Sequence, residues 1–175
     1  MIVRRAALAD AADIAAVHVR TWQAAYAHVF GAERLAGLDV RRRTAGWERS
    51  LREGETVFVA DEGGRVVGFA AVGPSRDDAD EAELYAIYAL PESWGSGAGP
   101  ALLGAGLEEM RAAGYEEAVL WVLEDNPRAR RFYAREGFEP DGGRKEESVL
   151  GMRVVEVRLR LRLAPARRRG PRRRG

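Results

Sequence analysis

Residues 83–103 decide the fold, and they read Glu83-Leu-Tyr-Ala-Ile-Tyr-Ala-Leu-Pro-Glu-Ser-Trp-Gly-Ser-Gly-Ala-Gly-Pro-Ala-Leu-Leu103. The pattern predicts a strand that passes through glycines at positions 95, 97 and 99 into the start of a helix. Glycines let the backbone turn tightly and approach a ligand, and the first N–H groups of a helix are unpaired at its positive end. The loop is therefore suited either to cradling a pyrophosphate or to a tight turn that holds no ligand.

Two common phosphate-binding loops do not fit this glycine pattern. A Walker A loop ends in Gly-Lys-Ser/Thr, whereas Pro100 and Ala101 follow the last glycine here. A dinucleotide-binding fingerprint needs Gly-x-Gly-x-x-Gly, and its third glycine position falls on Pro100 or on Leu102, depending on which glycine begins the count. The sequence therefore excludes both nucleotide-binding loops.

On either side of this stretch, the apolar spacing changes between helix and strand patterns. Leucines at 103 and 107 and a methionine at 110 predict a helix from the glycine loop to about Ala113-Gly114, and residues 118–123 predict a buried strand. The other expected elements are a strand over 2–5, helical stretches from Leu8 to Thr21 and through Trp22, Tyr26, Phe30 and Leu35, strands over 56–60 and 66–72 joined by a hairpin turn at 61–64, a helix from Pro127 and a strand over 155–163. This order predicts an α/β domain with a mixed sheet, because the strand–helix–strand unit requires parallel neighbours and the hairpin requires antiparallel ones.

The composition excludes several classes of protein. The chain has 175 residues, 46% of them hydrophobic, which suits one domain with a real core, and it has no cysteine for a disulfide, a thiolate metal site or a covalent thioester intermediate. No apolar run is long enough to cross a bilayer and no signal peptide is visible, so a soluble, cytoplasmic protein without a membrane partner is expected. Subtracting the six arginines of residues 165–175 from the net charge of +1 leaves −5 on residues 1–164.

The glycine loop is similar to motif A of the GNAT superfamily of N-acetyltransferases, whose Gln/Arg-x-x-Gly-x-Gly/Ala loop binds the pyrophosphate of coenzyme A. Trp94, Gly97 and Gly99 stand at its three key positions. Residues 120–138 resemble motif B, with Asn126-Pro-Arg-Ala129-Arg-Arg-Phe132-Tyr133 followed by Gly137-Phe138. Both motifs occur in the family's order and spacing, and the resemblance covers roughly residues 2–163.

The resemblance implies a single-domain GNAT fold over residues 1–164, with a mixed, mostly antiparallel sheet of six to seven strands and about four helices. It implies acetyl-CoA as co-substrate and no metal. The residues that it implies for binding acetyl-CoA are Ile87, Tyr88, Ala89, Leu90, Trp94, Gly95, Ser96, Gly97, Ala98, Gly99, Pro100, Asn126, Ala129 and Tyr133. Backbone N–H groups of the strand over 87–90, freed by a bulge, are the implied contact to the thioester oxygen.

Two positions depart from the family pattern. Trp94 replaces the usual Gln or Arg, so the polar side-chain contact to the phosphates is missing and backbone amides are left to bind them. Pro100 has no N–H, which removes one donor at the helix start, although proline suits the first helical turn. Binding is expected to persist in a weaker form.

Acetyl transfer to an amine needs a base, an oxyanion donor and a proton for the departing thiolate. Since the chain has no cysteine, direct attack in a ternary complex is expected. Glu83 lies eleven residues before Trp94, at the spacing of the general-base glutamate in the histone-acetylating branch, and it is either the base, a water-orienting group or a solvated strand-end charge. Tyr133 matches the tyrosine that protonates the coenzyme A thiolate, with core packing as the alternative.

Other side chains have both a ligand role and a structural one. Asn126 is either a contact to the pantetheine or the N-cap of the next helix. Trp22, Tyr26 and Tyr85 are predicted to line the acceptor pocket, although aromatic residues at helical spacing often belong to a core. His18 and His28 have no companions at metal-ligand spacing, which favours structural roles.

The expected function is acetyl-CoA-dependent acetylation of a primary amine: a small amine, a polyamine, an aminoglycoside-like amine or a peptide or protein amine. The negative charge of residues 1–164 favours a cationic acceptor. The alternative is a non-catalytic acyl-CoA sensor, or a nucleic-acid-associated module that works through the arginine-rich tail, residues 165–175, which is expected to be disordered. Relatives of this type often form homodimers, but the sequence shows no interface signature.

Overall fold

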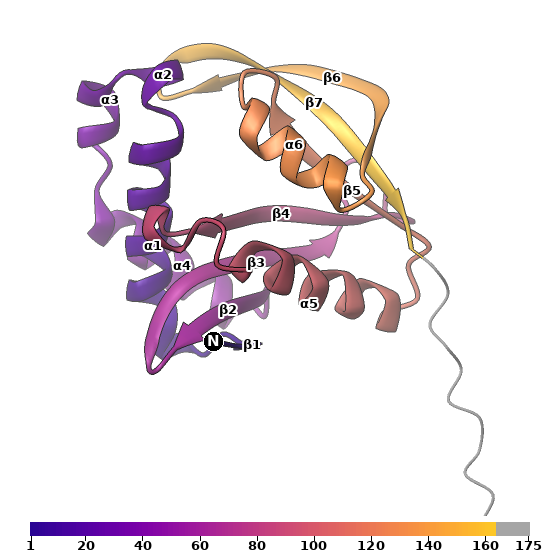
Figure 1. The fold of residues 1–175 in the computed structure, drawn as a ribbon, viewed down its shortest axis with the longest axis horizontal. Helices are drawn as coiled ribbons and strands as arrows, with labels where there is room; N and C mark the ends of the chain where they lie inside the picture. Colours follow the sequence, from indigo (N-terminus) through magenta and orange to yellow (C-terminus); the bar gives the residue numbers. More distant parts are fainter. Residues whose placement is uncertain (164–175) are drawn as a thin grey trace, which may run out of the picture.

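A single seven-stranded sheet organises the computed structural model, which describes residues 1–163 (Figure 1). The strands lie in the order β1-β2-β3-β4-β5-β7-β6, and every neighbouring pair is antiparallel except β4 and β5, which are parallel. Their bounds are Ile2–Arg5 (β1), Thr56–Glu62 (β2), Arg65–Pro74 (β3), Ala82–Ala89 (β4), Glu117–Leu123 (β5), Glu139–Val149 (β6) and Met152–Arg162 (β7). This agrees with the mixed, mostly antiparallel sheet of six to seven strands that the resemblance implied.

Helices cover both faces of the sheet. The phenyl ring of Phe69 in β3 contacts His18 and Trp47, which belong to α1 and α4, whereas the backbone of the preceding Gly68 lies against Leu102 of α5. Because neighbouring residues of a strand point to opposite faces, α1 and α4 lie on one face and α5 on the other. The helix bounds are Leu8–Asp10 (η1), Ala11–Ala25 (α1), Ala27–Phe30 (α2), Ala32–Ala36 (α3), Val40–Arg52 (α4), Pro91–Ser93 (η2), Ala98–Ala112 (α5) and Pro127–Arg135 (α6).

Most predicted elements are confirmed to within a few residues. The turn between β2 and β3 forms as expected, with Gly63 and Gly64 at positive φ and the Gly64 N–H donating to Asp61 Oδ1 over 2.7 Å. The helical stretch through residues 22–35 is broken at Tyr26 and Gly31 into the end of α1 and two short helices.

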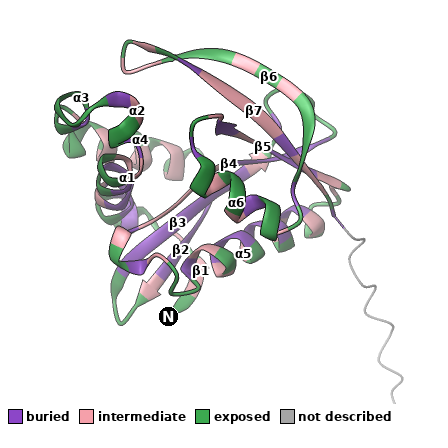
Figure 2. Cartoon of the chain, turned by 45° about the horizontal axis from the view of Figure 1, so that its top comes forward, coloured by how far each residue is buried: buried purple, intermediate pink, exposed green. Residues whose placement is uncertain are grey.

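Two elements were missed at the sequence level, α4 and β6. In α4, Val40, Trp47 and Leu51 recur at helical spacing after the N-cap Asp39, although none of its residues is fully buried. Strand β6 reads EPDGGRKEESV, has no apolar alternation and is largely exposed (Figure 2). Helix α4 attaches through Trp47 and Leu51, and β6 is held by its pairing with β7. Tertiary contacts, rather than a local pattern, therefore determine β6, whereas α4 carried a sequence signal that was not used.

The parallel pair β4 and β5 departs from a regular sheet in a way that matters for function. Only Ala82↔Ala118 and Glu83↔Val119 are in register, at the start of each strand. From there the two strands diverge, so that the backbone edge of β4 that faces β5 has no strand partner. A space opens at the centre of the sheet, between residues 84–89 and residues 121–123.

The arginine-rich tail predicted over 165–175 lies outside the described residues. None of the helices in the described part, residues 1–163, has the length and apolar character needed to cross a membrane.

Candidate active site

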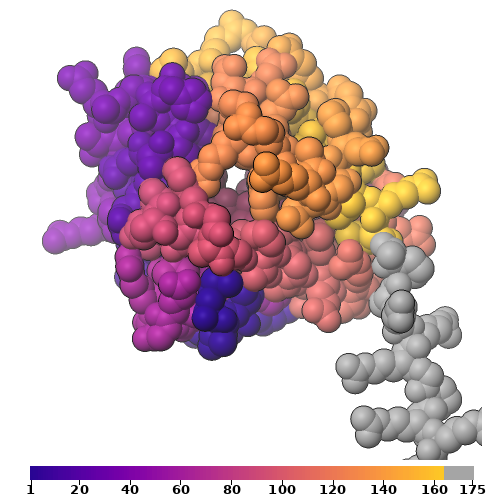
Figure 3. Space-filling model, in the orientation of Figure 1, coloured from indigo at the N-terminus to yellow at the C-terminus, as the bar shows by residue number. Residues whose placement is uncertain are grey.

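The divergence of β4 and β5 creates a pocket of about 620 Å³. In Figure 3 its mouth lies between the segment around residue 95 and α6, and at one point no atom blocks the view through the molecule. The pocket therefore reaches from the face covered by α5 and α6 toward the opposite face. Its lining includes residues from α1, β4, the glycine loop, β5, α6 and β7.

The glycine loop forms one wall of the mouth. Gly95 and Gly97 have φ angles of 81° and 93°, which residues with a side chain rarely adopt, and Gly97 is the N-cap of α5. A Cβ atom placed on either glycine would meet no protein atom within 4 Å, so this part of the loop faces open space. The loop thus brings the positive end of α5 to the pocket, with the Ser96 Oγ accepting only the first helical N–H, that of Ala98, over 3.4 Å.

Trp94 supports a cation at this mouth. Its Nε1 donates to the Ala89 carbonyl over 2.8 Å, and the guanidinium carbon of Arg128 lies 3.3 Å from the centre of its ring. Partial burial lowers the pKa of Arg128 from its ordinary value, and Arg131 and Arg135 line the same pocket. Backbone amides were the expected phosphate ligands, but the structure also places three arginines of α6 on the pocket wall, one of them stacked on Trp94.

Asn126 and Tyr133 lie on the α6 side of the pocket. The Asn126 Oδ1 accepts from the Ala129 N–H over 3.0 Å, so the predicted N-cap is confirmed, and both residues line the pocket. The ring of Tyr133 packs between Phe132 and Phe138, at centroid distances of 5.2 and 5.9 Å. Burial raises the pKa of the Tyr133 phenol, so the phenol stays protonated over the working pH range.

Aromatic side chains form the opposite part of the pocket. The predicted acceptor-pocket residues Trp22, Tyr26 and Tyr85 all line it, together with Phe30. The Trp22 ring is stacked on Phe30 and lies edge-on to Tyr26, at centroid distances of 6.0 and 5.1 Å. Trp22 Nε1 is buried and has no hydrogen-bond partner within residues 1–163.

Comparison with known proteins identifies the family. A profile of the acetyltransferase (GNAT) family matches residues 17–138. The chain belongs to this family. It is 38% identical over 161 residues to the uncharacterized N-acetyltransferase YuaI of Bacillus subtilis, and the match covers 90% of each protein.

Two solved structures resemble this GNAT acetyltransferase in fold. The PaiA N-acetyltransferase of Thermoplasma acidophilum, in complex with coenzyme A, has a TM-score of 0.71 at 21% identity and covers 92% of this chain and 98% of its own. YncA of Salmonella typhimurium, solved with its cofactor acetyl-CoA, has a TM-score of 0.68 at 24% identity, with 95% of each chain covered.

Glu83 does not reach the pocket of this acetyltransferase. Its side chain is 1% exposed and is absent from the pocket lining. The carboxylate is bound instead by Arg76, whose backbone N–H donates over 3.0 Å and whose guanidinium forms a bidentate ion pair with it. The geometry therefore argues against Glu83 as a general base and assigns it to anchoring the segment between β3 and β4.

Replacing Glu83 by glutamine tests this assignment. We expect kcat/KM to fall by less than about tenfold, because loss of a general base costs about 100- to 10,000-fold, whereas the ion pair only stabilises local structure. Arg76→Gln is the matched control, since it breaks the same ion pair from the other side, and steady-state rates of both variants should be similar. A much larger loss in Glu83→Gln than in Arg76→Gln would restore Glu83 as the base.

Three predicted coenzyme A contacts lie outside the pocket lining of the GNAT acetyltransferase: Leu90, Ser96 and Ala98. The Leu90 N–H donates to the Val67 carbonyl over 2.8 Å and its side chain is buried in the core, so neither group faces the pocket in this structure. Ser96 bonds the Ser93 carbonyl over 2.8 Å, and Ala98 is buried beneath the loop. The bulge expected near residues 87–90 occurs earlier, at Tyr85, where the β3–β4 register shifts.

The sequence analysis missed three kinds of pocket residue. The first kind is the arginines Arg128, Arg131 and Arg135, which occupy no key position of the two motifs. The others are Trp121, in the predicted buried strand, and Glu156, in the strand predicted over 155–163. The helical period of the arginines was a usable signal, since positions 128, 131 and 135 share one helix face.

Proposed function

We propose that this pocket binds acetyl-CoA through the mouth between the glycine loop and α6, and that residues 1–164 form the catalytic unit that transfers the acetyl group to a primary amine. The observation that carries the proposal is the glycine loop at the N-terminus of α5, which opens into the space between the divergent strands β4 and β5.

The residues present fit a pyrophosphate and an acyl chain. The loop leaves open space where Gly95 and Gly97 lack a side chain, and the N-terminal amides of α5 and the α6 arginines supply the positive potential that phosphates need. Trp22 Nε1 is a buried donor without a partner, which a bound acceptor atom would satisfy. Relatives in fold that were solved with coenzyme A or acetyl-CoA support the same ligand.

Each wall of the pocket has a distinct task in this proposal. The loop amides and Arg128 bind the phosphates, and Trp94 orients Arg128. Asn126 and Ala129, with the edge of β4 over residues 87–89 that has no strand partner, line the channel that holds the pantetheine arm. Trp22, Tyr26 and Tyr85 enclose the acceptor and exclude water from the reacting groups.

Acetyl-CoA, when bound, supplies an acetyl thioester to the pocket. The acceptor amine attacks as the free base in a ternary complex, because the chain has no cysteine to carry the acetyl group. Its proton leaves to water through the open end of the pocket. Tyr133 donates a hydrogen bond from its phenol to the thioester sulfur. Because burial raises the pKa of this phenol, Tyr133 stabilises the developing thiolate through the hydrogen bond and does not transfer its proton completely.

A thiol-release assay tests the function. We expect purified protein to release free coenzyme A from acetyl-CoA only when a primary amine is present, with initial velocities that give intersecting double-reciprocal lines, as a ternary complex requires. Parallel lines would contradict direct attack. Absence of release over a panel of small amines, polyamines and peptide amines would contradict the proposed activity.

A further inference from the structure

One carboxylate lies inside the aromatic part of the pocket. Among the described lining residues Glu156 is the single acid, and the three arginines stand on α6 at the other mouth. In the β5–β7 register Glu156 lies opposite Leu123, and Leu123 packs in one cluster with Tyr26 and Phe30. The pocket is therefore polarised, with cations beside the glycine loop and an anion beside the aromatic rings.

The aromatic residues around Glu156 suit a positively charged ligand. Trp22, Tyr26 and Phe30 present three rings within 5.1 to 6.0 Å of one another. Aromatic faces attract ammonium groups, and the attraction grows in a desolvated site. Burial and, to a smaller extent, the charge of Glu156 raise the pKa of Tyr26, which agrees with the carboxylate lying close to these rings.

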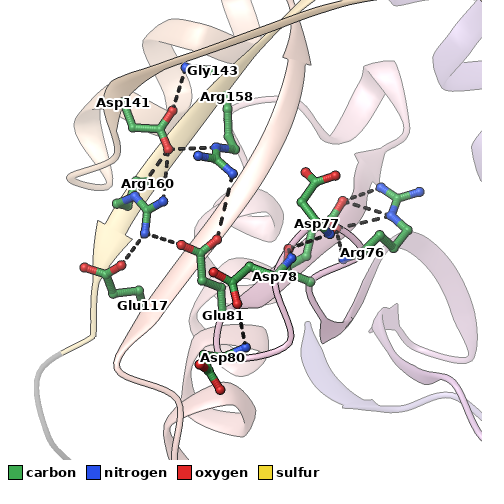
Figure 4. A network of polar contacts seen from close by, with 12 residues as sticks. Arg76, Asp77, Asp78, Asp80, Glu81, Glu117, Asp141, Gly143, Arg158 and Arg160 are labelled. Atoms are coloured by element: carbon green, nitrogen blue, oxygen red, sulfur yellow. Dashed lines mark hydrogen bonds and ion pairs between the residues drawn. The ribbon is translucent and has the colours of Figure 1, made fainter.

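Neighbouring cations do not cancel this negative charge. Arg158 and Arg160 on β7 are bound by Asp141, Glu81 and Glu117, as Figure 4 shows.

Lys145 approaches the Glu156 carboxylate to 3.4 Å, but its ammonium is shared with Glu147 at 3.6 Å and lies over the Trp121 ring. One lysine between two carboxylates leaves a net negative charge at this end of the pocket.

Resting on the proposed function, we infer that Glu156 selects acceptors that carry a second ammonium group, so that the acceptor class is a diamine or polyamine. The nitrogen that attacks the thioester has to be neutral. The ammonium that pairs with Glu156 is therefore a different nitrogen of the same molecule, and its alkyl chain lies against the aromatic rings. Glu156 binds the acceptor and does not take the reacting proton.

The test compares two acceptors of equal length, putrescine and the amino alcohol in which a hydroxyl replaces one ammonium. We expect wild-type kcat/KM for the diamine to exceed that for the amino alcohol by about 10- to 100-fold, the range for one charged hydrogen-bonded contact. In Glu156→Gln this ratio should fall close to one. A large and equal loss with both acceptors would make Glu156 a base. Wild-type kcat/KM values with both acceptors would remove Glu156 from the site. Either result overturns the inference.

Two further variants change the ion pairs of Glu156 without replacing Glu156 itself. Glu147→Gln removes the other partner of Lys145 and leaves its ammonium to Glu156 alone, so the ratio should fall although Glu156 itself is unchanged. Lys145→Gln removes the competing cation, so the ratio should rise. A fall in the ratio in Lys145→Gln would contradict the inference without depending on how well Glu156→Gln folds.

Calorimetric titration of the wild-type protein and of each variant with coenzyme A distinguishes a failure of the inference about Glu156 from a failure of the proposed function. If coenzyme A binds and amines are acetylated without preference for the diamine, the inference about Glu156 is wrong and the proposed function stands. If coenzyme A does not bind the wild-type protein, the proposed function itself fails.

Discussion

Replacing Gly97 by valine is expected to weaken acetyl-CoA binding at least about 100-fold. Gly97 is the N-cap of α5, with φ at 93°, and a β-branched residue is strained in this conformation. The valine side chain would also project into the open space at the loop, where no protein atom lies within 4 Å, and would occupy the place proposed for the phosphates. Calorimetric titration with acetyl-CoA measures the change in affinity.

Gly54→Val is the matched control for backbone strain. Gly54 has φ at 87° and open space around its missing side chain, as Gly97 has, but it lies between α4 and β2, outside the pocket. Both variants should lose thermal stability to a similar degree, and only Gly97→Val should lose the ligand. Equal affinity in the two variants would place the phosphate site elsewhere.

Tyr133→Phe is expected to lower kcat about 100-fold while acetyl-CoA affinity stays within about twofold. The phenol is buried and protonated, so its O–H is a preorganised donor whose interaction strengthens as charge develops on the sulfur. Phenylalanine keeps the ring packing against Phe132 and Phe138, so the fold should be retained. Steady-state rates and the calorimetric affinity together separate a loss in the chemical step from a loss in binding.

Tyr115→Phe controls for removal of a tyrosine hydroxyl. Tyr115 packs at the edge of the core and is not part of the pocket lining, so its variant should keep the wild-type kcat. If Tyr133→Phe also kept the wild-type kcat, Tyr133 would have only a packing role.

The sequence predicted those parts of the candidate site that lie within short, continuous segments of the chain. A strand, a run of glycines and a helix start form one continuous segment, and the α6 residues Asn126, Ala129 and Tyr133 follow from a motif of fixed spacing. Residues 1–163 bring these two segments to opposite walls of one pocket, as the resemblance implied.

The acceptor end could not be predicted in the same way. The role of Glu156 depends on where β4 and β5 diverge and on which strand pairs with β5, and both are long-range features. The alternation of apolar and charged residues predicted β7 correctly, but it did not indicate that Glu156 would line the pocket. The ion pair of Glu83 could not be predicted for a related reason, since nothing in its spacing from Trp94 indicated that Arg76 would bind its carboxylate.

The most direct test of the account is calorimetric titration of the wild-type protein with acetyl-CoA. We expect one acetyl-CoA to bind per chain with a micromolar Kd, and this binding to be abolished in Gly97→Val and retained in Gly54→Val. Absence of binding, or an affinity that Gly97→Val leaves unchanged, would contradict the claim that the glycine loop forms the acetyl-CoA site.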